Sequence, residues 1–112
     1  MSRRTAKVEE LIREEISKLI QSELTEDLGI ISVTRSVVAP DLKTAQIYVT
    51  AVIADREKEI LLALKKKTPD FQRVIGHKIQ TRYTPKLSFK FDIARREIDR
   101  VEELLGEINR GA

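Results

Sequence analysis

The chain has 112 residues and a formal net charge of +3 at pH 7, a length that predicts a single domain over residues 1–112. It contains no cysteine, which excludes disulfides, thiolate zinc sites and a cysteine nucleophile. No apolar run reaches the roughly 18 residues of a membrane span, and the amino terminus has no signal-peptide core. We therefore expect a soluble, cytoplasmic protein with no membrane partner.

The first predicted element is a helix from Thr5 to Leu24, because its apolar residues recur at a spacing that places them along one stripe. The spacing of apolar residues then changes to a period of two, and the β-branched residues of segment 30–39 predict a half-buried strand. Alternation puts apolar side chains on one side and hydroxyls on the other, namely Ile31, Val33 and Val37 against Ser32, Thr34 and Ser36. Arg35 interrupts the apolar side.

A second strand follows a turn at residues 39–43, where Pro40 and Asp41 supply turn chemistry. Its alternation predicts an inward face of Ala45, Ile47, Val49 and Ala51. Because the turn is short, the two strands should form an antiparallel hairpin with one covered face.

Two consecutive helices are predicted next. Asp55 is the expected cap of the first, which should run to about Lys67. Pro69 has no amide proton and should break the helix at residues 68–70, where Thr68 suits the cap of a second helix that continues to Ile79.

Pro85 then opens a third strand, with Leu87, Phe89 and Phe91 inward and Ser88 and Lys90 outward. A final helix is predicted at roughly residues 95–109. The order is therefore α-β-β-α-α-β-α, an α+β two-layer sandwich in which the helices pack on one face of a three-stranded sheet.

Positive charge is concentrated in residues 65–92, which hold eight of the 21 basic residues but only two of the 18 acidic ones. This segment carries +6, and the rest of the chain carries −3. Such a concentrated field favours a polyanion, and nucleic acid is the leading candidate. The alternative is that these lysines only keep the helices soluble. The predicted RNA-binding residues are Lys65, Lys66, Lys67, Arg73, Lys78, Arg82, Lys86 and Lys90, with Arg3 and Arg4.

The sequence offers little from which to build a catalytic or metal site. His77 is the only histidine, so a histidine-rich zinc site, a Ser-His-Asp triad and a Cys-His pair each lack a member. The four glycines form neither a dinucleotide fingerprint nor a Walker loop. We therefore expect no enzyme activity, no metal and no cofactor.

Four segments resemble the bacterial ribosome-binding factor A family, whose fold is a type II KH-like domain: RTAKVEELI at 4–12, PDLKTAQIYVT at 40–50, RYTPKLSFKFD at 82–92 and IDRVEELL at 98–105. The resemblance implies a binding factor that associates with the small (30S) ribosomal subunit during late assembly, and we expect the protein to be a monomer. It also implies contact with 16S rRNA, help in that RNA's processing, and a role in growth in the cold.

Ordinary KH domains grip a nucleic-acid backbone with a Gly-x-x-Gly loop, which this chain lacks. The family resembled here has an Ala-x-Gly kink instead, and without gaps that motif falls on Lys67-Thr68-Pro69. We expect Pro69 to break the helix in its place. Ser36 is a second departure, since it stands where the family usually has an apolar residue.

Two other functions remain open. One is a protein-interaction module that docks a partner on an exposed sheet face bearing Gln46 and Tyr48, or on the acidic terminal helix. The other is non-specific DNA binding. Salt dependence distinguishes the first from RNA binding, because phosphate contacts weaken steeply with salt, and competition between duplex DNA and rRNA distinguishes the second.

Overall fold

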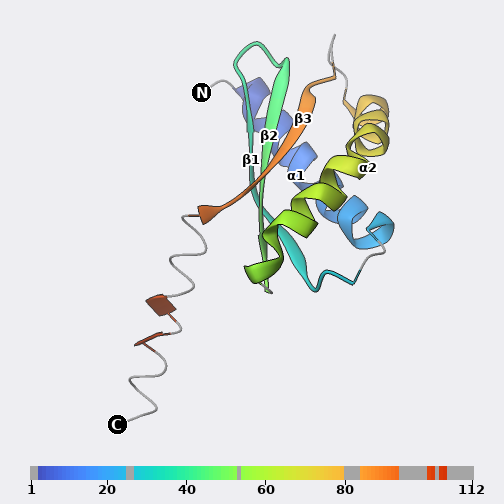
Figure 1. The fold of residues 1–112 in the computed structure, drawn as a ribbon. Coiled ribbons are helices and arrows are strands. Elements are labelled where there is room, and N and C mark those ends of the chain that lie inside the picture. The colour runs from blue at the N-terminus through green and yellow to red at the C-terminus, as the bar shows by residue number, and fades with distance from the viewer. Residues whose placement is uncertain are drawn as a thin grey trace.

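The structure is a computed structural model that describes residues 3–24, 27–52, 54–79, 84–93, 101–102 and 104–105. Two long helices cover one face of a three-stranded sheet (Figure 1). In chain order the elements are α1 (Arg3–Glu23), β1 (Ile31–Val38), β2 (Thr44–Ala51), the 3-10 turn η1 (Ala54–Arg56), α2 (Glu57–Lys78) and β3 (Lys86–Phe91). The predicted α+β class is confirmed, but the predicted order is not.

The sheet has the strand order β1-β2-β3 and is mixed. β1 and β2 pair antiparallel, as the predicted hairpin requires, whereas β2 and β3 pair parallel, with Ala45 beside Leu87. The inward residues of β2 are almost fully covered, since Ala45 is 1% exposed and Ile47 and Val49 are 0% exposed. Alternation along β2 and β3 therefore identified the buried face of both strands.

The core lies between this sheet face and the helices. α1 packs on β1 and α2 packs on β3. The two helices fill the core with residues at helical spacing, namely Val8, Ile12, Ile16 and Ile20 from α1 and Ile60, Leu64, Phe71 and Ile75 from α2. Phe71 meets the ring of Phe89 edge to face, with 6.2 Å between centroids, an arrangement that aromatic quadrupoles favour.

The predicted helix break at Pro69 is wrong. α2 is one helix through residues 57–78 with Pro69 inside it, and Figure 1 shows it changing direction partway along. Thr68 does not cap a new helix, because its Oγ1 donates back to the Leu64 carbonyl at 2.8 Å. Proline removes one hydrogen bond of the helix, and Leu64 and Phe71, both 0% exposed, hold the two halves to the same core. The result is a kink.

The start of this helix also differs from the prediction. Asp55 lies in the 3-10 turn, and the N-cap position belongs to Arg56, which makes no side-chain capping bond. A short 3-10 turn therefore leads into α2 where the sequence suggested a side-chain cap. The predicted helix at residues 95–109 lies largely outside the described residues.

A β-bulge overturns the predicted faces of β1 beyond its middle. The pairing passes from Val33 opposite Val49 to Arg35 opposite Tyr48, so Thr34 is the extra residue. Because side chains alternate with a period of two, one inserted residue exchanges the faces of everything after it. Val37, predicted to be buried, is 43% exposed, while Ser36 is 9% exposed.

The buried Ser36 is accommodated by α1. Its Oγ donates to the Glu9 carbonyl at 2.5 Å, and the neighbouring Val38 backbone N–H donates to the Glu9 carboxylate at 2.9 Å. These bonds satisfy a hydroxyl on the covered face, where a polar group without a partner would be costly. They also attach the first turns of α1 to the end of β1.

Candidate nucleic-acid interface

The predicted lysine run lies in the middle of α2, just before the kink. Lys65 and Lys66 are exposed and Lys67 is half-buried. Among the described residues, none of the three forms an ion pair with an acidic side chain, since the ion pairs found there involve other cations. Their charges are therefore available to an external anion.

A groove of about 440 Å³ lies between α2 and β3, beside the kink. Lys65 and Lys86 line it together, although they are far apart in the chain. Its remaining lining comes from the same two elements: Leu61, Thr68 and Pro69 of α2, and Leu87, Ser88 and Phe89 of β3. The groove thus combines two lysines with apolar surface and two hydroxyls, a lining that suits a sugar-phosphate backbone.

Gln72 holds the two walls of this groove together. Its Nε2 donates to the Pro85 carbonyl, and the Leu87 backbone N–H donates to its Oε1 at 3.0 Å. The side chain lies one helical turn beyond the kink and reaches the outer edge of β3. It therefore sets how α2 sits against β3, and with it the position of Lys65 relative to Lys86.

A second hollow, of about 760 Å³, lies where α2 faces the segment before β1, and Lys65 and Lys66 line it with Leu28, Leu62 and Ala63. Arg56 and Glu59 complete its lining. The Glu59 carboxylate, 2.7 Å from the guanidinium, raises the pKa of Arg56. Arg56 also donates to the Asp27 carbonyl at 2.6 Å, so its charge is used within the protein. Lys65 borders both hollows.

Two other predicted RNA-binding residues already have acidic partners. Arg73 pairs with Asp70 at 2.5 Å, and Lys78 lies 3.6 Å from Glu15 of α1. A phosphate would have to compete with these carboxylates. Arg73 and Lys78 are accordingly weaker candidates than the lysine run.

The remaining predicted residues lie on other surfaces. Arg3 and Arg4 are exposed at the start of α1, which packs on the β1 side of the sheet, away from β3. Lys90 is exposed on β3, on the sheet face that the helices leave open. Arg82 lies outside the described residues. The structure therefore brings together only part of the predicted set.

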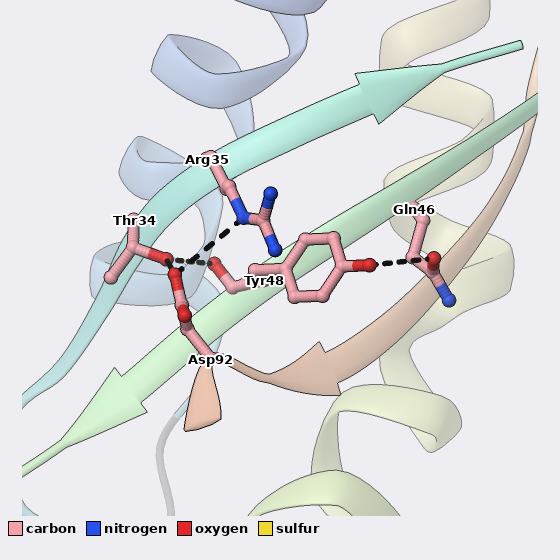
Figure 2. Close-up of polar contacts among 5 residues, drawn as sticks. All are labelled: Thr34, Arg35, Gln46, Tyr48 and Asp92. Atoms are coloured by element: carbon pink, nitrogen blue, oxygen red, sulfur yellow. Dashed lines mark hydrogen bonds and ion pairs between the residues drawn. The ribbon is translucent and has the colours of Figure 1, made fainter. Parts of the chain in front are cut away.

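One cluster on the open face was predicted only in part: Gln46 and Tyr48 were expected on an exposed sheet face, as a docking surface for a protein partner, but the Arg35 side chain was not expected to join them. The Arg35 guanidinium carbon lies 4.0 Å from the centroid of the Tyr48 ring, and the Tyr48 hydroxyl donates to Gln46 at 2.9 Å. Asp92 is 3.7 Å from Arg35 and accepts a hydrogen bond from Thr34 at 2.6 Å (Figure 2). For Arg35 itself, only the interruption of the apolar alternation in β1 pointed to this site.

Other site classes find no support in the described part of the chain. No group of three or more His, Cys, Asp or Glu side chains there could hold a metal ion. No helix there has the length and apolarity that crossing a membrane requires.

Comparison with known proteins points to one family. The model of the ribosome-binding factor A family matches residues 4–105. The ribosome-binding factor A of Thermomicrobium roseum is 37% identical over 109 residues, covering 96% of this chain and 84% of that protein. That of Desulforamulus reducens is 32% identical over 111 residues, covering 97% and 92%.

Two solved structures share the fold, each at 21% sequence identity. The crystal structure of ribosome-binding factor A from Thermus thermophilus aligns with a TM-score of 0.69, covering 77% of this chain and 93% of that one. A Thermus thermophilus homology model fitted into the cryo-EM map of a 30S complex aligns with a TM-score of 0.67, covering 80% and 96%. From the family match over most of its length and from full-length relatives above 30% identity, this chain belongs to the ribosome-binding factor A family.

Proposed function

We propose that the protein binds the small (30S) ribosomal subunit during late assembly and assists the maturation of its 16S rRNA by contacting the RNA backbone. The observation that carries this proposal is the lysine run beside the α2–β3 groove, in which Lys65 and Lys66 are exposed and, among the described residues, none of the three lysines pairs with an acidic side chain. The related Thermus thermophilus protein has been fitted into a map of a 30S complex, which supports the same partner here. The family consists of assembly factors, not enzymes, and acts in the cytoplasm.

The groove suits backbone recognition more than base reading. Lys65 and Lys86 each offer a compact ammonium charge on a flexible stem, which positions a phosphate without specifying sequence. The apolar wall of Leu87 and Phe89 can cover a ribose. Recognition of this kind depends on the shape of the folded RNA, which fits a factor that acts on one RNA site of a subunit.

We also infer that the architecture is of the type II KH kind. α2, kinked at Pro69, then takes the place of the two central helices that such a domain has, and β3 pairs parallel to β2 beside it. In this arrangement the kink stands where an ordinary KH domain has its Gly-x-x-Gly loop, and the α2–β3 groove adjoins it.

The test is co-sedimentation with ribosomal particles, using a double variant with Lys65→Gln and Lys66→Gln. A matched control carries Lys18→Gln and Lys58→Gln, which remove the same charge at exposed lysines that line neither hollow. The wild-type protein and the control should co-sediment with free small subunits and not with translating ribosomes. The lysine-run variant should bind more weakly, and the slope of log affinity against log salt should fall by about 1.5 units, at roughly 0.7–0.9 per phosphate contact.

Equal binding by the lysine-run variant and the control would remove the lysine run from the interface. A competition experiment tests the alternative of non-specific DNA binding. If duplex DNA releases the protein from small subunits as effectively as free rRNA does, non-specific DNA binding is favoured.

A further inference from the structure

The open face of the sheet is positively charged. Its outward side chains include Arg35, Lys86 and Lys90, all exposed, and the sequences of β1, β2 and β3 contain no aspartate or glutamate. Asp92 follows β3 directly, but its side chain is only 8% exposed and it accepts a hydrogen bond from Thr34. The face therefore presents three cations and no exposed carboxylate from its strands.

The centre of this face is a preformed stack. The guanidinium of Arg35 lies over the Tyr48 ring, 4.0 Å from the centroid, and Asp92 holds it from the side at 3.7 Å. The bulge at Thr34 turns Arg35 to this face, which is how bulges commonly re-aim a side chain. Figure 2 shows the guanidinium lying above the ring, between Thr34 and Gln46. The Arg35 side chain is 56% exposed, so the outer side of the stack is open to a ligand.

These features favour one kind of partner. Unpaired bases stack on guanidinium planes and on aromatic rings, whereas the bases of a duplex are already stacked on each other. The surrounding cations favour phosphate, and an apolar partner would find little surface, since the residues exposed here are mainly polar. The face also adjoins the α2–β3 groove at Lys86, which lines that groove.

We propose that the open sheet face is a second RNA-contact surface, on which an unpaired base stacks on Arg35 above Tyr48 while Lys90 binds a neighbouring phosphate. The inference deepens the proposed function and rests on it for the source of the RNA, a single-stranded segment of rRNA. The open sheet face differs from the α2–β3 groove in the chemistry of binding, because base stacking requires a planar group whereas phosphate binding in the groove requires charge.

The experiment measures binding of the full-length protein to a labelled single-stranded RNA of ten adenosines and to an RNA duplex of ten base pairs. Arg35→Lys keeps the positive charge but removes the planar guanidinium group. It should therefore weaken binding to the single strand about tenfold, as loss of a stacked base does, and leave binding to the duplex unchanged. Tyr48→Leu should weaken it similarly. Tyr48→Phe, which keeps the ring, should bind as the wild type does. Thermal melts of each variant verify folding.

Several outcomes would overturn the inference. Single-strand affinity of Arg35→Lys within twofold of wild type is one, and equal binding of single strand and duplex by the wild-type protein is another. If Arg35→Lys leaves RNA binding intact and yet weakens co-sedimentation with small subunits, the face docks a protein instead. The two proposals can also fail separately. If the Lys65→Gln, Lys66→Gln variant loses subunit binding while Arg35→Lys behaves as the wild type in every assay, the open sheet face is rejected as an RNA-contact surface and the proposed function is retained.

Discussion

Gln72 of α2 and Leu87 of β3 are joined at the outer edge of the sheet, where the Leu87 backbone N–H donates to the Gln72 Oε1 at 3.0 Å. The same side-chain amide donates to the Pro85 carbonyl. The Gln72 side chain therefore hydrogen-bonds the outer backbone groups at the start of β3, as a neighbouring fourth strand would. Unpaired backbone groups on an edge strand invite pairing with another chain, and here a helix side chain occupies them.

We expect Gln72→Leu to destabilise the protein by about 1–3 kcal/mol, because it leaves a backbone N–H and a carbonyl of the β3 edge without their partner. Urea unfolding measures the loss, and hydrogen exchange at the Leu87 amide should accelerate. Gln72→Glu is the matched control, since it keeps an acceptor for Leu87 while losing the donor to Pro85. A Gln72→Leu variant as stable as wild type would show that the edge gains nothing from this contact.

Phe71→Ala should cost about 3–5 kcal/mol, since the side chain is 0% exposed and sits where α2 meets β3. Phe89→Ala should cost less, because Phe89 is only half-buried, although it also loses the edge-to-face pair with Phe71. Denaturant melts of the two variants give the comparison. Ile30→Ala, at a site 69% exposed, is a control expected to change stability by under about 0.5 kcal/mol. The reverse ranking of Phe71 and Phe89 would contradict the described packing.

Arg73→Gln and Lys78→Gln should each change the salt dependence of RNA binding less than Lys65→Gln does. The reason is that Asp70 and Glu15 already partner the first two cations, so a phosphate gains less from them. Lys65→Gln should lower the salt slope by roughly 0.7–0.9 units. Titrations at several salt concentrations test the ranking, and equal slopes for all three variants would mean that the internal pairs open freely when RNA binds.

Pro69→Ala should stabilise the protein by roughly 1 kcal/mol and weaken RNA binding modestly. The helix already passes through this position, so alanine restores a backbone donor at little cost, while the more flexible unfolded chain offsets part of the gain. Leu64 and Phe71 should keep most of the kink. Urea melts and backbone chemical shifts of residues 64–72 provide the check, and a clear loss of stability would mean that the kink depends on the proline ring itself.

Much of the fold was predictable because local pattern and tertiary structure agree. The alternation in β2 and β3 and the helical stripe of α1 predicted the covered side of each element, where the structure places residues in the core or, as with the half-buried Phe89 and Phe91, packed against it. At Pro69 the local sequence pattern and the tertiary structure disagree. Local rules predict a break, yet the buried Leu64 and Phe71 on either side outweigh one missing hydrogen bond. Such a balance depends on what lies across the core, and the flanking residues do not reveal it.

The candidate site was predictable only in part for a similar reason. The lysine run was visible as a charge cluster, but the groove that joins Lys65 to Lys86 arises from tertiary packing. The bulge at Thr34 follows from its pairing with β2, and no residue type marks it. Without the bulge, Arg35 would be assigned to the covered face and its contact with Tyr48 would not be anticipated.

The parallel pairing of β3 with β2 also bears on the order of folding. β1 and β2 are neighbours in the chain and can pair through a short turn, whereas β3 reaches β2 only after α2 has crossed over between them. Contacts between distant segments form late because they require a large loop to close. We therefore expect the α2–β3 groove to appear only in the last step of folding, so that a nascent or partly folded chain has its lysines but no site at which to hold RNA.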